Sequence, residues 1–461
     1  MRYPGCMSLE LSSLRLLEPA LRHLQDGFPD LPAFATGAEL DELAPVLQQV
    51  AERMRDNFPY HHPFYAGQML KPPHPVARLA YMLAMWINPN NHALDGGRAS
   101  SAMEKEAVAA IAHMFGWREH LGHLCGGGTM ANLEALWVAG RSHPGRAILA
   151  SSQSHYTHSR ISDVLGLPFE AVPADASGRM SVAALAARAR RTDASAIGTV
   201  VATLGTTGLG AIDPLPEILE LAREHGFRVH VDAAYGGYFG LADNLSAPTR
   251  AAFDRIAEAD SIVIDPHKHG LQPYGCGCVL FRDPAVGQIY RHDSPYTYFS
   301  SQELHLGEIS LECSRAGAAA VALWATQRHL PMEPGGKFAQ GLSSSRRAAR
   351  WLHRHILEES RFLPILEPEL DIVVWASAGE RASTISQRSQ ELFDATAARG
   401  LHLALIALPA ALLRAHWPEV EFDTAEVTCL RSCLMKAEHE GWMERIWARL
   451  LESVDACRWP G

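Results

Sequence analysis

Short apolar runs alternate with amphipathic stretches over much of the chain, and this rhythm predicts an α/β fold. The apolar runs that predict strands cover residues 120–125, 147–150, 197–204, 228–232, 261–264 and 277–281. Turns that contain glycine or histidine follow several of these runs, and helical patterns come next. Strands that alternate with helices favour an open, mostly parallel central sheet flanked by helices.

Helical periodicity and its punctuation divide the chain into three parts. Residues 10–60 have a helical pattern, and Ser101 and Glu104 have capping-box spacing, which predicts that a helix begins there. A second helix is predicted over 214–225, with Asp213 as its cap and Gly226 after its end. A helical pattern over 317–330 precedes a glycine pair that resembles a hinge. We therefore expect a helical N-terminal segment over 1–100, a large domain over 101–330 and a small α+β domain over 331–461.

Composition and charge exclude several classes of protein. Hydrophobic residues make up 47% of the chain and charged residues 20%, which is ordinary globular usage. The formal charge is −10 and the basic residues are scattered, so we expect no nucleic-acid partner. The N-terminus lacks the apolar core of a signal peptide, and the apolar run 403–413 is too short to span a bilayer. Eight cysteines without a signal sequence favour reduced thiols, so we expect a cytoplasmic protein with no membrane partner.

Polar residues and glycines collect where the predicted strands end. In open α/β sheets, ligands bind beyond the carboxyl ends of the strands, so these residues form one set. A glycine run that leads into a helix offers free N–H groups to a phosphate, and a carboxylate can keep a ring nitrogen protonated. A flat histidine ring can stack on a cofactor, and a lysine after a buried strand can form a Schiff base. The set comprises Gly126 to Thr129, His155, Thr206, Asp232 and Lys268.

Each of these residues taken alone has an ordinary structural explanation, as a tight turn, a salt-bridged aspartate or a hydrogen-bonded histidine. Together they match the contacts that pyridoxal 5′-phosphate needs. A metal site built from Asp265, His267 and His269 is the competing hypothesis. It would place the Lys268 ammonium beside a cation and leave the glycine turn without a role, so we expect no metal.

Several motifs resemble the group II pyridoxal-phosphate-dependent amino acid decarboxylases of fold type I. The specific matches are HVDAAYGG, DPHK and SSQSHYTHSRISDVLGL; looser ones are HPFYAG, GGGTMANLEAL, TLGTTGLGAIDPL and LECSRAG. The resemblance covers roughly residues 55–330, with a fainter match in TCLRSCLMKAEHEGW. It implies the fold of that family, pyridoxal 5′-phosphate as cofactor, and conversion of an L-amino acid to an amine and carbon dioxide. It also implies a homodimer.

The resemblance assigns roles around the cofactor. Lys268 would bind it covalently, Asp232 would pair with the ring nitrogen, and His155 and Ala234 would contact the two faces of the ring. Gly128, Thr129 and His267 would contact the phosphate, while Thr206 and Asp265 would line the same cavity.

The resemblance also assigns roles around the substrate. HPFYAGQM matches the family's N-terminal substrate loop, which makes Gln68 a candidate for contacting the substrate carboxylate, with Phe64 and Tyr65 nearby. The segment 292–308 occupies the place of the family's catalytic loop, and Tyr296 or Tyr298 would deliver a proton to the substrate.

The substrate and the outcome of the reaction stay open at this point. Many eukaryotic members have tryptophan where this chain has His269, and some have asparagine where it has Asp265. The aromatic loop 58–65 favours a tyrosine-like substrate, with an acidic amino acid, glutamate or aspartate, as the alternative. The same cofactor could instead serve oxidative deamination to an aldehyde or a carbon–carbon lyase of the sphingosine-phosphate type. A metal-dependent hydrolase and a non-catalytic protein on a borrowed fold are the alternatives from other classes.

Overall fold

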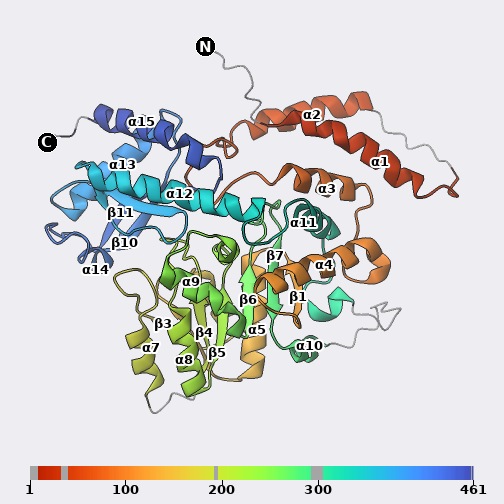
Figure 1. Ribbon diagram of the computed structural model, residues 1–461, viewed down its shortest axis with the longest axis horizontal. Helices are drawn as coiled ribbons and strands as arrows, with labels where there is room; N and C mark the ends of the chain where they lie inside the picture. Colours follow the sequence, from red (N-terminus) through yellow and green to blue (C-terminus); the bar gives the residue numbers. More distant parts are fainter. Residues whose placement is uncertain (1–8, 33–39, 192–195, 292–304, 458, 460–461) are drawn as a thin grey trace.

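A seven-stranded sheet forms the centre of the larger domain (Figure 1). The computed structural model describes residues 9–32, 40–191, 196–291, 305–457 and 459. The strand order is β1-β7-β6-β5-β4-β2-β3, and within this sheet only β7 runs antiparallel to its neighbours. The strands are β1 (Leu121–Cys125), β2 (Ala147–Ser151), β3 (Phe169–Val172), β4 (Ile197–Thr203), β5 (Arg228–Asp232), β6 (Ser261–Ile264) and β7 (Gly277–Phe281). The six predicted strands are confirmed to within one residue at each end, and β3 is an additional strand.

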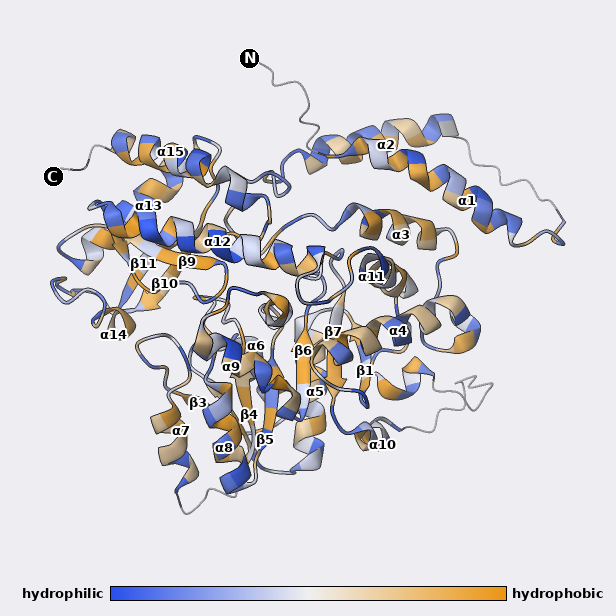
Figure 2. Ribbon diagram, viewed as in Figure 1, coloured by the Kyte–Doolittle hydropathy of each residue, from blue (hydrophilic) through white to orange (hydrophobic). Residues whose placement is uncertain are grey.

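Helices cover both faces of this sheet. Successive strand residues point to opposite faces, so Val200 packs in the cluster that contains residues of α8, whereas Val201 packs in the cluster that contains residues of α5. Figure 2 shows the resulting apolar strands between amphipathic helices. The helices are α4 (Arg98–Met114), α5 (Gly128–Ser142), α6 (Thr157–Val164), α7 (Val182–Ala189), α8 (Leu215–His225), α9 (Ala247–Asp254), α10 (Gly287–Tyr290) and α11 (Gly317–His329).

The C-terminal part of the chain forms a smaller domain around an antiparallel sheet. Its strand order is β10-β11-β9-β8, with β8 (Phe362–Pro364), β9 (Ile372–Ser377), β10 (Ala404–Pro409) and β11 (Glu426–Cys433). Trp375 is fully buried in its core, 4.7 Å from the ring of Phe362. The helices of this part are α12 (Lys337–Glu358), α13 (Ala382–Ala397), α14 (Ala410–Leu413) and α15 (His439–Cys457).

The segment around Ala66 belongs structurally to this smaller domain, although it lies far away in sequence. The backbone N–H of Ala66 donates to the carbonyl of His402 at 2.8 Å, and the N–H of Cys433 donates to the carbonyl of Ala66 at 2.8 Å. Ala66 is completely buried in the C-terminal core. Residues that follow it are therefore held between the two domains.

The first helices extend away from the body of the molecule (Figure 1). They are the 3₁₀ helix Leu11–Leu16, α1 (Leu17–Asp26) and α2 (Leu40–Met54), and they precede α3 (Pro75–Met85). Neither the 3₁₀ helix nor α1 has a buried residue. The helical pattern predicted for this region is confirmed by these elements.

Two predicted caps are wrong because their side chains have distant partners. Helix α4 begins at Arg98, so the buried Ser101 and Glu104 lie inside the helix and not at its start. Glu104 instead accepts hydrogen bonds from Asn91 at 2.6 Å and from the backbone of Leu124 at 2.9 Å. It also forms a buried ion pair with Arg315.

Asp213 likewise does not cap α8. Its carboxylate accepts from the backbone of Met180 at 2.7 Å and of Thr203 at 2.8 Å, and the N-cap residue is Pro214. Gly226 ends the helix with φ 76°, as predicted.

Candidate active site

A cavity of about 310 Å³ lies at the carboxyl ends of the central strands. The cavity collects residues from β1, β4, β5 and β6 because the carboxyl ends of parallel strands lie at one edge of a sheet. The predicted site residues on its wall are Gly128, Thr129, His155, Asp232, Ala234, Asp265, His267 and Lys268. Residues separated by as many as 140 positions in the sequence are thus brought together.

One end of the cavity is the N-terminus of α5. Gly127 precedes the helix with φ 142°, and no side chain in the described part of the chain caps the helix, so its first N–H groups stay available. A Cβ atom on Gly128 would lie 2.7 Å from a carboxylate oxygen of Asp265. The turn therefore requires glycine, and it presents the kind of helix end that binds phosphate.

Near this end, Lys268 and Asp265 form an ion pair. The Lys268 Nζ lies 3.0 Å from Asp265 Oδ2, and the other carboxylate oxygen, Oδ1, is buried without a hydrogen-bond partner among the described residues. Nδ1 of His267 donates to the carbonyl of Cys276 at 2.9 Å, which directs Nε2 towards Asp265, 3.5 Å away. The cavity thus holds a lysine amine and an unused acceptor.

Asp232 provides a fixed negative charge elsewhere on the wall. Its Oδ2 accepts from Nε2 of His158 at 2.8 Å, and its Oδ1 accepts from the backbone N–H of Ala234 at 3.1 Å. Burial alone would raise the pKa of Asp232, but the hydrogen bond from His158 and the charge of Lys268 hold this pKa well below its usual range. Asp232 is therefore ionised at neutral pH and can keep a ring nitrogen protonated.

His155 presents a neutral, oriented ring. Its Nδ1 accepts from the backbone N–H of Thr157 at 3.2 Å and from the Thr157 hydroxyl at 2.7 Å. Burial lowers the pKa of His155 below its ordinary value. An uncharged ring fixed in this way suits stacking on a flat cofactor.

These features fit pyridoxal 5′-phosphate. A glycine turn at a helix N-terminus suits the phosphate, an ionised aspartate suits the ring nitrogen, and a lysine amine lies in the same cavity. The orphaned oxygen of Asp265 leaves one buried acceptor for a further donor.

Three residues that the sequence placed at this site lie elsewhere. Thr206 is buried, but its hydroxyl accepts from the backbone of Ala211 at 3.0 Å within its own turn. The wall is formed instead by Thr203, Gly205 and Thr207. Phe64 and Tyr65 do not line this cavity either, since both pack against the C-terminal domain.

Gln68 is exposed and contacts Arg431, an arginine that was not predicted as a site residue. Its Oε1 accepts from Nη2 of Arg431 at 3.2 Å. The next residue, Met69, accepts through its carbonyl from the hydroxyl of Tyr274 at 3.2 Å, and the Tyr274 ring lies 4.8 Å from that of His267 on the cavity wall. Tyr296 and Tyr298 lie outside the described residues, so their role as proton donors stays a prediction.

Two functional candidates were missed from the sequence, His158 and Arg431. His158 follows His155 by three residues, which is the spacing of neighbours on one face of a helix, and this was the available signal. Arg431 lies in the weakly matching segment near the C-terminus.

The residues of the competing metal hypothesis do not converge. His269 lies 3.3 Å from Asp371 and packs against the rings of Tyr235 and Phe239, away from the cofactor cavity. Among the described residues there is no group of three or more histidine, cysteine, aspartate or glutamate side chains placed to hold a metal ion. In the same part of the chain, no helix has both the length and the apolar character to cross a bilayer.

Comparison with known proteins shows one consistent family. The family model of the pyridoxal-dependent decarboxylase conserved domain matches residues 145–377. L-tyrosine decarboxylase of Enterococcus faecium is 28% identical over 483 residues, covering 79% of each chain. L-aspartate decarboxylase of Thermococcus kodakarensis is 28% identical, covering 83% of this chain and 96% of the relative. A crystal structure of Oryza sativa TDC with PLP and tryptamine has a TM-score of 0.75 at 18% identity and covers 99% of both chains, which shows the same fold.

The hydrogen bond between His158 and Asp232 yields a testable prediction. Replacing His158 with leucine leaves a buried carboxylate without its side-chain donor, so the pKa of Asp232 should rise. Turnover, measured against pH with the cofactor bound, should then be lost at a higher pH on the acid side than in the wild type. His158→Gln, whose amide can donate, should retain most of the wild-type profile.

Asp232→Asn is the reference for complete loss of this charge. It should lower turnover by about 10²- to 10³-fold, or roughly 3–4 kcal/mol, while the phosphate end still binds. An acid limb in His158→Leu that coincides with that of the wild type would refute the assigned role of His158.

Proposed function

The chain belongs to the pyridoxal-dependent decarboxylase family, and we propose that Lys268 and Asp232 hold its cofactor while it converts an L-amino acid to the amine and carbon dioxide. The observation that carries this proposal is the presence of both side chains, with the glycine turn at α5, on the wall of one cavity. When bound, pyridoxal 5′-phosphate supplies a conjugated ring that accepts the electron pair left as carbon dioxide departs.

Each side chain then has a defined task. The Lys268 amine would bind the cofactor covalently, with Asp265 as its counter-ion at 3.0 Å. Asp232, ionised and held by His158, would keep a proton on the ring nitrogen, and the N-terminus of α5 would hold the phosphate. The neutral ring of His155 would support the flat ring of the cofactor.

Arg431 bears on the class of substrate. Its side chain is buried, with the residue 6% exposed, and it has no carboxylate within ion-pair distance among the described residues. A buried guanidinium without a counter-ion is costly, and the carboxylate of an acidic side chain would supply a bidentate partner. A cation bound to the α-carboxylate would stabilise the negative charge of that group, which disappears as carbon dioxide leaves, and would therefore slow the reaction. We therefore propose that Arg431 binds the carboxylate of the substrate side chain.

Two substrate classes therefore have separate support. The pair formed by Arg431 and Gln68 favours an acidic amino acid such as aspartate. The tyrosine-like substrate was predicted from the aromatic loop, of which Phe64 and Tyr65 pack against the C-terminal domain. Relatives of both specificities match the chain, so L-aspartate and L-tyrosine are the two substrates to compare.

The comparison is sharpest with Arg431→Gln, which retains hydrogen bonding but removes the charge. For an acidic substrate, kcat/KM should fall by roughly 10²-fold, because a buried charged hydrogen bond is lost, while activity on L-tyrosine should stay within about threefold. Amine formation and carbon dioxide release are measured for both substrates, with Lys268→Ala as the blank. Activity on L-tyrosine alone, unaffected by Arg431→Gln, would reject the acidic class, and carbon dioxide release with neither substrate would count against both classes.

We also propose that the protein is a homodimer that covers its N-terminal helices. Apolar residues on α2 recur at positions 43, 46, 47, 50 and 54, which is the spacing of one helix face, and all are between 51% and 66% exposed. The 3₁₀ helix before α1 exposes Leu11, Leu14 and Leu16 in the same way. A second copy of the chain is the partner that the family resemblance favours.

Charge on this apolar face should weaken the dimer. In Leu47→Asp/Val50→Asp, the dissociation constant of the dimer should rise roughly a hundredfold or more, because charged groups would have to be buried. Sedimentation equilibrium measures the constant, and Gln48→Asp on the opposite side of the same helix is the matched control. A wild-type protein that sediments as a monomer, or a double variant with an unchanged constant, would contradict the proposal.

A further inference from the structure

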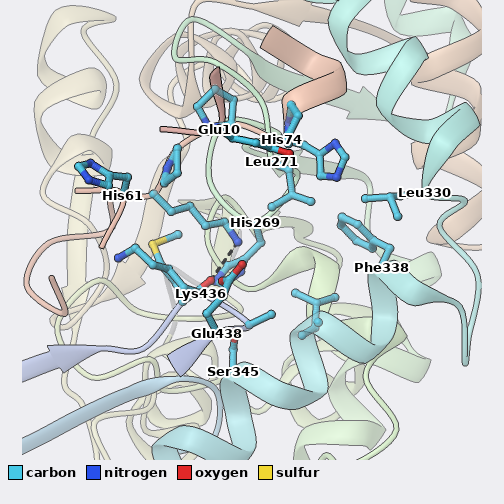
Figure 3. A pocket seen from close by; sticks show the side chains of 18 of the residues that line it. Glu10, His61, His74, His269, Leu271, Leu330, Phe338, Ser345, Lys436 and Glu438 are labelled. Atoms are coloured by element: carbon cyan, nitrogen blue, oxygen red, sulfur yellow. Dashed lines mark hydrogen bonds between the residues drawn. The ribbon is translucent and has the colours of Figure 1, made fainter. Parts of the chain in front are cut away.

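A second, larger cavity lies next to the candidate active site but is separate from it. It has a volume of about 410 Å³ and lies among the segment 71–78, helix α12 and the turn 435–438 that follows β11 (Figure 3). Among the described residues, none lines both cavities. Two consecutive residues nevertheless line different cavities: Lys268 lines the candidate active site and His269 lines the second cavity.

Lys436, which is buried, and Lys71, which is half-buried, line this second cavity. The chain has only five lysines among its 41 lysine and arginine residues, and three of the five line this cavity: Lys71, Lys436 and the solvent-exposed Lys337. The Nζ of Lys71 donates to the carbonyl of Met435 at 3.0 Å, and the Nζ of Lys436 donates to the carbonyl of Tyr65 at 2.6 Å. Each ammonium has three N–H donors, and among the described residues neither has a carboxylate within ion-pair distance.

The acidic groups around the two lysines have other partners or lie at the rim. Asp371 accepts from the hydroxyl of Tyr235 at 2.6 Å and lies 3.3 Å from His269. Glu10 pairs with Arg78 at 3.3 Å, and Glu438 is exposed. Asp371 and Glu438 favour the charged form of Lys71. Glu438 and Cys433 favour the charged form of Lys436, whereas Lys71 disfavours it. Lys436 in turn lowers the pKa of the neighbouring His439.

Burial disfavours the charged form of both lysines. Burial lowers the pKa of Lys71 to about 8, and burial together with repulsion from Lys71 lowers the pKa of Lys436 to about 7. A negative ligand between them would reverse this effect by supplying the missing counter-charge.

The other wall of the cavity is apolar. It is formed by side chains from three parts of the chain, as Figure 3 shows for Leu271, Leu330 and Phe338. Leu342 and Met435 continue this surface. A cavity of this volume that combines apolar side chains with charged and polar groups has the character of a small-molecule site.

We propose that this cavity binds a small organic carboxylate, whose charged group lies between Lys71 and Lys436. Its apolar body packs against Leu271, Phe338 and Leu342. The site is distinct from the one that binds the amino acid substrate, so it adds a second ligand to the protein.

The proposal fixes the direction of the pH dependence. Only the ammonium forms attract a carboxylate, and in the free protein Lys436 loses its proton near pH 7 and Lys71 near pH 8. Affinity should therefore be greatest below about pH 7 and fall as the pH rises, by up to roughly tenfold per pH unit for each lysine that must take up a proton.

Calorimetric titration of the holoenzyme with hexanoate tests the site. Hexanoate should bind at pH 6.5 and lose at least tenfold in affinity by pH 9. Lys71→Met and Lys436→Met, which keep the length of the side chain but not its charge, should each raise the dissociation constant roughly tenfold or more. Lys105→Met, on α4 outside the cavity, should leave it unchanged.

Two probes separate charge from apolar contact. Hexanol has the same apolar body without the charge, and inorganic phosphate has charge without the body, so both should bind at least tenfold more weakly than hexanoate. Equal binding of either probe, absence of hexanoate binding at pH 6.5, or unchanged affinity in both methionine variants would overturn the proposal.

Wild-type protein labelled with ¹³C at the lysine ε-carbons allows a test that needs no variant. With five lysines, the spectrum is simple, and hexanoate should shift the ε-carbon resonances of Lys71 and Lys436 more than that of the exposed Lys337, and raise the pKa of Lys71 and Lys436. Resonances that all stay in place at saturating hexanoate would reject the site. Because no described residue lines both cavities, neither outcome bears on the decarboxylase assignment.

Discussion

The buried hydrogen bond between His158 and Asp232 is the interaction on which the candidate active site depends. A carboxylate in the interior normally favours its neutral form, and a neutral carboxyl group could not keep a ring nitrogen protonated. His158, at 2.8 Å, and the nearby charge of Lys268 reverse that tendency and hold the pKa of Asp232 low. The fold must therefore keep helix α6 fixed against the end of β5, because the donor comes from one and the acceptor from the other.

The parallel register of the central strands explains why these groups meet at all. Thr203, Asp232 and Val263 are paired across β4, β5 and β6, so the residues that follow these strands enter one cavity. The turn after β6 then sends Lys268 into this cavity and His269 into the second one. Tyr235 lines the first cavity and His269 the second, and both lie against the buried carboxylate of Asp371. One short turn thus forms part of the wall of two chemically different cavities.

Features with a local signal were predictable, and features that depend on distant partners were not. Apolar runs located six strands, and the residues that follow them supplied most of the cavity wall. Glu104 and Asp213 had the spacing of helix caps, yet each binds backbone groups that the sequence does not place beside it. His158 contacts an aspartate 74 positions away, and the ring of Phe64 packs against that of Trp442, near the other end of the chain. Burial and long-range contacts, rather than local propensity, decided these cases.

The central claim is that Lys268 holds the cofactor, and the position of the covalent link tests it most directly. Borohydride reduction of the holoenzyme fixes the cofactor on the amine that binds it, and peptide mass mapping then locates the label among only five lysines. Lys71 and Lys436 could also react with the cofactor aldehyde, because burial lowers the pKa values of their amines to about 8 and about 7. The account predicts one pyridoxyl group per chain, on Lys268. A label on Lys71 or Lys436, or a holoenzyme that takes up no label, would contradict it.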